Sequence, residues 1–195
     1  MEQEEQKLNS LPDNAYRELK PGEEYKPIMP ARTQPKEVTT YSVVFGIIMA
    51  IIFSAAAAYL GLKVGQVFEA AIPIAIIAVG CGNLMKKNNM LGQNVIIQSI
   101  GASSGVIVAG AIFTLPALYI LGLDAKFYQI FLSSLLGGLL GILMLIPFRK
   151  YFVKDMHGKY PFPEATATTE VLVSGENTGN QAQLLAVSGL IGGLY

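Results

Sequence analysis

The stretch VTTYSVVFGIIMAIIFSAAAAYLGL, residues 38–62, decides the fold of this chain because it holds no charged side chain. The hydrocarbon core of a bilayer is about 30 Å thick and an α-helix rises about 1.5 Å per residue, so about 20 predominantly apolar residues can span it. Residues 38–62 exceed that length. The sequence therefore predicts an integral membrane protein.

Three more segments of this kind follow along the chain. Residues 65–85 hold one acid, Glu69, near their start, and residues 95–121 and 127–148 hold no charge. The connections between these segments are short, so consecutive helices are expected to run antiparallel. We predict an all-α polytopic bundle with four full transmembrane helices, at about residues 38–62, 65–85, 95–121 and 127–148.

A shorter apolar segment follows at residues 181–195. Its length of about 15 residues is too small for a membrane crossing. We interpret it as a truncated, partial fifth helix, and the chain as the N-terminal fragment of a longer protein. A short re-entrant or interfacial helix is the alternative.

The N-terminal residues 1–37 differ sharply from the rest in composition. They contain half of all the charged residues and five of the ten prolines, with few large apolar side chains. Such a segment buries too little apolar surface to offset the entropy lost on ordering. We predict a disordered tail over residues 1–37, followed by a membrane domain over residues 38–195.

The distribution of basic residues predicts the orientation. A cytoplasmic N-terminus puts the tail, the turn at residues 86–87 and the loop at residues 149–159 on the cytoplasmic side, and these hold 12 of the 14 basic residues. Lys63 and Lys126 would lie outside. Since cytoplasmic loops carry the excess of Lys and Arg, we predict a multi-pass protein of the plasma membrane with a cytoplasmic N-terminus.

Several function classes are excluded by what the sequence lacks. The formal net charge is zero, so no basic surface favours nucleic acid. The only cysteine is Cys81 and the only histidine is His157, which leaves no multi-Cys or His-rich metal site. No phosphate-binding loop motif is present. We therefore predict no metal, no cofactor, no ATP-driven pump and no enzyme.

Small residues recur at four-residue spacing, as at Gly61/Gly65, Gly101/Gly105 and Ser133/Gly137. Small residues at this spacing let transmembrane helices approach closely. Packing within one subunit explains the pattern, and a homodimer seam or a substrate path remains open.

Polar residues inside the apolar segments are the first candidates for a site. Glu69 opens the second helix, where the helix dipole stabilises an acid, but it could equally titrate a proton or contact a substrate amine. Gln98 and Ser103 belong to a polar face of the third helix. Hydrogen bonds between helices and the lining of a hydrated pathway are both consistent with that face.

The stretch YPFPEATATTEVL, residues 160–172, supplies three more candidates, Glu164, Thr168 and Glu170. Pro161 and Pro163 break any preceding helix, and a short polar helix is expected to follow. Secondary transporters place such broken segments where they line a cavity. An interfacial cytoplasmic helix fits the pattern equally well.

Several motifs taken in order carry a resemblance to a known family. They are AYLGLKVGQ at 58–66 with EAAIP at 69–73, GAIFTLPAL at 110–118, and YPFPEATA at 160–167 with EVL at 170–172 and Gly175-Glu176. Together they resemble the prokaryotic branch of the oligopeptide transporter family, related to the Yellow Stripe-like transporters of metal chelates.

The resemblance implies a long, all-helical secondary transporter with the Pro-Phe-Pro-Glu stretch near its translocation path. It also implies substrates that are small peptides, peptide-like conjugates or metal chelates, moved with protons. Our first hypothesis is therefore a proton-coupled symporter in the bilayer. The alternative is a non-transporting membrane subunit or assembly module.

Overall fold

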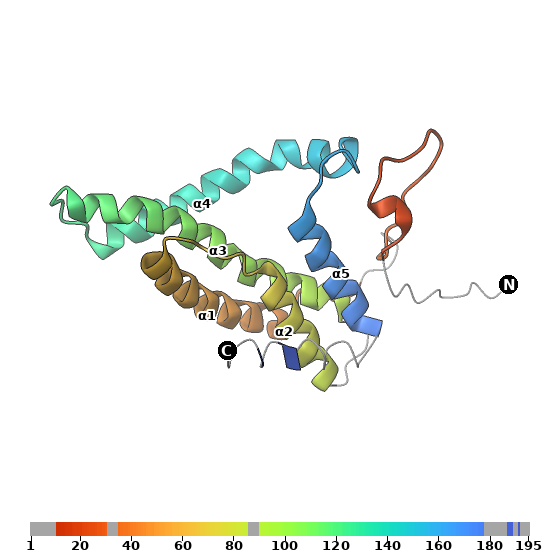
Figure 1. Cartoon of the computed structure of the whole chain (residues 1–195), viewed down its shortest axis with the longest axis horizontal. Coiled ribbons are helices and arrows are strands. Elements are labelled where there is room, and N and C mark those ends of the chain that lie inside the picture. The colour runs from red at the N-terminus through yellow and green to blue at the C-terminus, as the bar shows by residue number, and fades with distance from the viewer. Residues whose placement is uncertain (1–10, 31–34, 86–89, 178–186, 189–190, 192–195) are drawn as a thin grey trace.

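The computed structural model describes residues 11–30, 35–85, 90–177, 187–188 and 191. Its elements, all helical, are η1 (Asp13–Ala15), α1 (Thr40–Val64), α2 (Ala71–Leu84), α3 (Leu91–Ile120), α4 (Phe127–Lys150), the π-helical turn η2 (Tyr151–Asp155) and α5 (Pro163–Asn177). The described residues contain no strand, which confirms the predicted all-α class (Figure 1). The expected partial helix at 181–195 lies largely outside the described residues.

Three of these helices are long and apolar enough to cross a membrane: α1, α3, and α4 with its continuation to Asp155. Helix α2 is apolar but has 14 residues. At about 1.5 Å per residue it is about 21 Å long, shorter than the hydrocarbon core. The predicted full span at 65–85 is thus a shorter helix in the structure, whereas the third helix begins at Leu91 rather than near 95.

The reason for the shorter second helix lies in the chain before it. Helix α1 ends at Gly65, whose φ of +76° is a left-handed conformation that glycine adopts without strain. Residues 66–70 are not helical. Pro73 then falls in the first turn of α2, where its missing N–H costs no helical hydrogen bond.

The non-helical segment runs back towards the middle of the bundle. Val67 lies against Gly61 of α1, and the carbonyl oxygen of Phe68 lies close to Gly105 of α3. Ala70, the residue before α2, is fully buried in an apolar cluster at the centre of the bundle. As a result, α2 begins level with the middle of α3 and extends towards one end only (Figure 1).

Helices α1 and α3 run parallel, side by side, because glycines remove side chains from their interface. A Cβ atom at Gly46 would lie 3.0 Å from the Cβ atom of Ile100, and one at Gly61 would lie 2.5 Å from Cδ1 of Ile112. The central cluster fills the space between these helices and α2. Its buried members are Met49, Ala70, Ile74, Ala78 and Ile97.

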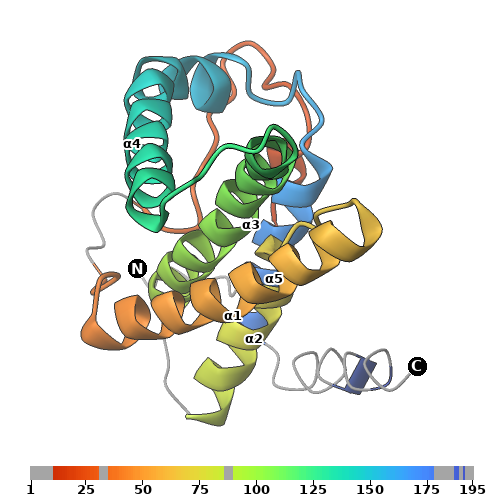
Figure 2. The ribbon, with the colours of Figure 1, turned by 90° about the vertical axis from the view of Figure 1, so that its left-hand side faces the viewer.

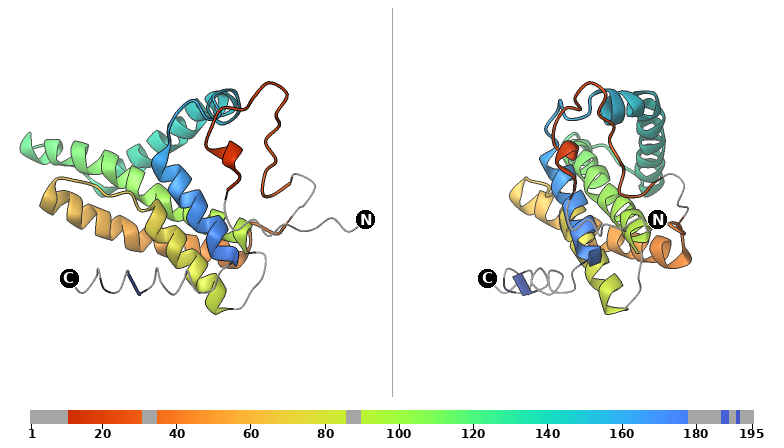
Figure 3. Two further views of the ribbon diagram at one scale, coloured as in Figure 1. Left: turned by 45° about the vertical axis from the view of Figure 1, so that its right-hand side comes forward. Right: turned by 90° about the vertical axis from the view of Figure 1, so that its right-hand side faces the viewer.

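Helix α4 lies on the opposite side of α3 from α1 (Figure 2). Every residue of α4 except Ile130 is exposed within the described chain. Helix α5 instead packs along α2: the Nδ2 atom of Asn83 donates to the carbonyl of Gly175 (3.0 Å), and Leu172 packs against Ala75 and Val79. The two short helices run in the same direction (Figure 3).

Part of the predicted tail makes defined contacts. Residues 11–30 form a loop with one 3₁₀ turn beside η2 and α5 (Figure 3). Leu11 is only 9% exposed, and the hydroxyl of Tyr16 reaches Glu170.

Candidate functional site

A cavity of about 660 Å³ opens where α2 and α5 begin, along the first half of α3. We call it the acidic cavity. Five of the six residues predicted from sequence line it, from three segments far apart in the chain. They are Glu69, Gln98, Ser103, Glu164 and Thr168.

The two acids lie near the N-termini of two parallel helices. Glu69 lies two residues before the first residue of α2, and Glu164 is the second residue of α5. The partial positive charge of a helix N-terminus stabilises a carboxylate there. Both side chains are exposed rather than covered by protein, so they are available to whatever enters the cavity.

The hydroxyl groups in the acidic cavity donate to the backbone of their own helices. Ser103 Oγ donates to the carbonyl of Ile100 (2.7 Å), and Thr168 Oγ1 donates to that of Glu164 (2.8 Å). Each hydroxyl oxygen still has lone pairs that accept hydrogen bonds. These groups therefore present acceptors to a ligand that carries N–H donors.

Charge and shape restrict what the acidic cavity accepts. Its described lining includes two carboxylates and no Lys, Arg or His, and the remaining wall is mainly apolar. Among the described residues, no three His, Cys, Asp or Glu side chains are close enough to hold a metal ion. The chemistry fits a ligand with a protonated amine and some apolar surface.

Glu170 is the predicted residue that lies elsewhere. Its Oε1 atom accepts the Tyr16 hydroxyl at 2.5 Å, in a separate surface pocket beside His157. Because this carboxylate accepts a hydrogen bond from the protonated phenol, the pKa of Tyr16 is raised to about 12. Glu170 therefore anchors the N-terminal segment instead of lining the acidic cavity.

Sequence reasoning missed one wall of the acidic cavity altogether. Five residues of the N-terminal segment line it: Leu11, Tyr25, Pro27, Ile28 and Met29. The Pro-rich, charged composition of this segment gave no indication that it lines a cavity. Only the apolar pair Ile28-Met29 within that segment could have indicated a buried contact.

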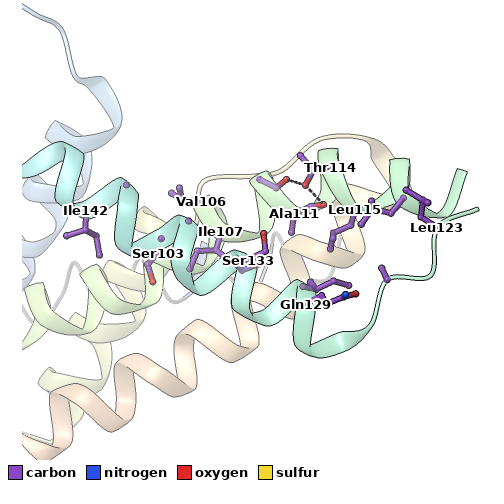
Figure 4. A pocket seen from close by; sticks show the side chains of 18 of the residues that line it. Ser103, Val106, Ile107, Ala111, Thr114, Leu115, Leu123, Gln129, Ser133 and Ile142 are labelled. Carbon is purple, nitrogen blue, oxygen red and sulfur yellow. Dashed lines mark hydrogen bonds between the residues drawn. The ribbon is translucent and has the colours of Figure 1, made fainter. Parts of the chain in front are cut away.

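A second cavity of about 940 Å³ lies between α3, from Ser103 to Leu118, and α4, from Gln129 to Leu145 (Figure 4). Asp124 is the one charged residue in its described lining. Thr114 Oγ1, which also lines it, donates to the carbonyl of Gly110 (2.8 Å). Ser103 and Val106 line both cavities, so the two meet near the middle of α3.

Comparison with known proteins identifies the family of the chain. The family described as OPT oligopeptide transporter protein matches residues 37–195. A Haemophilus influenzae protein named "Putative oligopeptide transporter" is 34% identical over 140 residues, which cover 70% of this chain and 22% of that relative. The chain thus spans about a fifth of the length of this curated relative. No solved structure matches the chain.

Proposed function

Because the chain belongs to the oligopeptide transporter family, we propose that it forms part of a secondary active, proton-coupled transporter of small peptides, peptide-like conjugates or metal chelates. Membership of this family supports membrane transport as the function of the chain and argues against enzyme activity. The acidic cavity is the observation that carries the finer proposal.

Two carboxylates level with the middle of a spanning helix are costly in an apolar solvent. Acids in membrane segments face a hydrated cavity or a partner, and they commonly take part in proton or substrate movement. Glu69 and Glu164 meet this description because both line the acidic cavity. In the proposed mechanism, one of them takes up and releases a proton as access to the cavity changes.

Discontinuous helices support the same assignment. Secondary transporters bind substrate where half-helices begin or end inside the membrane domain. Helices α2 and α5 have 14 and 15 residues, and residues at the start of both line the acidic cavity. Their N–H groups and dipoles would bind a substrate carboxylate, while Glu69 and Glu164 would bind its amine.

The two cavities supply a path along α3. The acidic cavity follows α3 from Leu91 to Val106, and the second cavity follows it from Ser103 to Leu118. In our proposal a substrate passes the shared residues Ser103 and Val106.

We propose a plasma-membrane location with the N-terminus in the cytoplasm. Arg149 and Lys150 lie in the last turn of α4 and Lys154 lies in η2. This end of α4 and η2 lie at the same end of the molecule as the N-terminal segment (Figure 3). The excess of basic residues at that end supports a cytoplasmic position. Ser133 and Gly137 of α4 line the second cavity, which favours the substrate path over a homodimer seam for these small residues.

The test is uptake of labelled tetrapeptides and of ferric chelates into cells that express the complete reading frame, with and without an inward proton gradient. We expect gradient-driven uptake, and we expect Glu164→Gln to abolish the gradient dependence. Glu24→Gln is the matched control, because Glu24 is exposed and outside the acidic cavity. Unchanged gradient-driven uptake in Glu164→Gln would remove this residue from the mechanism. No uptake with the protein verified in the membrane would favour a non-transporting subunit or assembly module.

A further inference from the structure

The N-terminal segment over residues 11–30, which we call the strap, covers one side of the acidic cavity. Tyr25, Pro27, Ile28 and Met29 line the cavity opposite α3 and α5, and Leu11 joins them from the other end of the strap. Met29 also approaches Gly92 in the first turn of α3. The strap therefore forms a wall of the cavity that no transmembrane helix in the described chain provides.

Polar and aromatic contacts hold the strap to the membrane domain. The Tyr16 hydroxyl donates to Glu170 on α5, His157 Nε2 hydrogen-bonds the carbonyl of Asn14 (2.8 Å), and the rings of Tyr25 and His157 lie 5.3 Å apart. The Tyr16–Glu170 hydrogen bond is exposed to solvent. Contacts of this kind hold a segment in place reversibly, since water can replace an exposed hydrogen bond.

The receiving turn on the membrane domain is shaped for the strap. Gly158 has a φ of +72°, and a Cβ atom on it would collide with the backbone of Arg17 and Glu18. Glycine is thus required both by the turn and by the approach of the strap. This double requirement distinguishes a docking surface from an accidental contact.

The strap is also stiffened internally. The guanidinium group of Arg17 donates two hydrogen bonds to Glu23, both 2.8 Å, and the backbone N–H of Lys20 donates to the same carboxylate. This pairing closes the loop between Arg17 and Glu23 into one unit. A stiff unit held by a few polar contacts moves as a whole.

We propose that the strap is a gate of the acidic cavity, closed when Tyr16 is bound to Glu170 and open when that contact breaks. Helix α5 links the gate to the site, because it carries Glu164 and Thr168 on the cavity side and Glu170 under the strap. A movement of α5 on ligand binding would therefore change the hydrogen bond between Tyr16 and Glu170 that holds the strap. The inference rests on the acidic cavity of the proposed function, but closure is measurable without transport.

The experiment measures how fast a cysteine inside the cavity reacts. In protein from the complete reading frame, Cys81→Ala removes the native thiol of the described chain and Ala102→Cys places a thiol in the cavity lining. A membrane-impermeant maleimide is applied to membrane vesicles of both orientations. Loss of one hydrogen bond to a charged acceptor should raise the labelling rate about tenfold in Tyr16→Phe. Deletion of residues 1–30 should raise it at least as much.

Two comparisons make the result decisive. Tyr128→Phe makes the same chemical change, loss of a tyrosine hydroxyl, on α4 and away from the strap. It should leave the labelling rate unchanged. Tyr16→Phe and Glu170→Ala should each raise the rate, and the double variant should be no faster than either one, because both remove the same contact. A rate that neither Tyr16→Phe nor the deletion alters would overturn the gate. Faster labelling in a protein that transports nothing would support the gate while rejecting the proposed function.

Discussion

The close contact between α3 and the start of α2 makes Gly101→Ala an informative substitution. A Cβ atom at Gly101 would lie 2.8 Å from Cδ1 and 2.9 Å from Cγ2 of Ile74, and 3.3 Å from Cβ of Met49. Ile74 is fully buried, so its side chain can shift only against packed neighbours. The added methyl group must therefore displace the Ile74 side chain or push α2 away from α3.

The size of the effect follows from two opposing terms. Overpacking a filled interior costs about 1–3 kcal/mol, and replacing glycine by alanine within a helix returns about 0.5–1 kcal/mol. The expected net loss in the free energy of unfolding is about 1 kcal/mol. Gly110→Ala is the matched control, because Gly110 lies on the same helix and nothing lies within 4 Å of the position of its Cβ atom. The helix term is the same in both variants, so their difference isolates the packing term.

Unfolding in mixed micelles, followed by circular dichroism, measures both variants in protein from the complete reading frame. We expect Gly110→Ala to be about as stable as wild type or slightly more stable, and Gly101→Ala to be less stable. We also expect a weaker apparent substrate affinity in Gly101→Ala, because displaced α2 carries Glu69 away from the cavity. If Gly101→Ala proves as stable as Gly110→Ala, α2 does not pack against α3 as described.

Two further predictions concern the strap. Gly158→Ala should speed labelling of the cavity cysteine, because it adds backbone strain and a collision with Arg17, whereas Gly122→Ala, with a similar φ of +68° and open space around it, should not. The Tyr16 pKa of about 12 lies above its ordinary value of 10.0, so the Tyr16 contact is at full strength below about pH 10 and is lost as the pH rises through about 12. An ultraviolet difference titration of wild type against Tyr16→Phe should show tyrosinate forming near pH 12, and a midpoint near pH 10 would contradict the contact.

The cavity residues were predictable because polar side chains are rare in apolar segments. Glu69, Gln98 and Ser103 stand out from residues that need an apolar solvent, and Glu164 follows a proline that ends the preceding segment. Their grouping around one cavity was not predictable. It depends on the non-helical residues 66–70, and mean hydropathy over residues 65–85 does not detect this break because the segment as a whole is apolar enough for a helix.

The strap was missed for a different reason. Composition estimates whether a segment can fold by itself, and residues 11–30 bury little apolar surface of their own. Their order comes from partners that are remote in sequence: Tyr16 binds Glu170, 154 residues away, and Asn14 binds His157, 143 residues away. Such pairings carry no local pattern, so the sequence did not indicate that Glu170 contacts Tyr16.

The break before α2 and the acidic cavity depend on each other. A backbone that leaves the helix inside a membrane domain exposes N–H and C=O groups, which is tolerated only where protein covers them or a cavity supplies water. At residues 66–70 both conditions hold: Gly105 admits the carbonyl of Phe68 on one side, and Glu69 opens to the cavity on the other. A continuous helix over residues 65–85 would satisfy its own backbone, but it would move the start of α2 away from α5. The two acids would then no longer share a cavity, so a chain that binds one ligand between Glu69 and Glu164 needs the break.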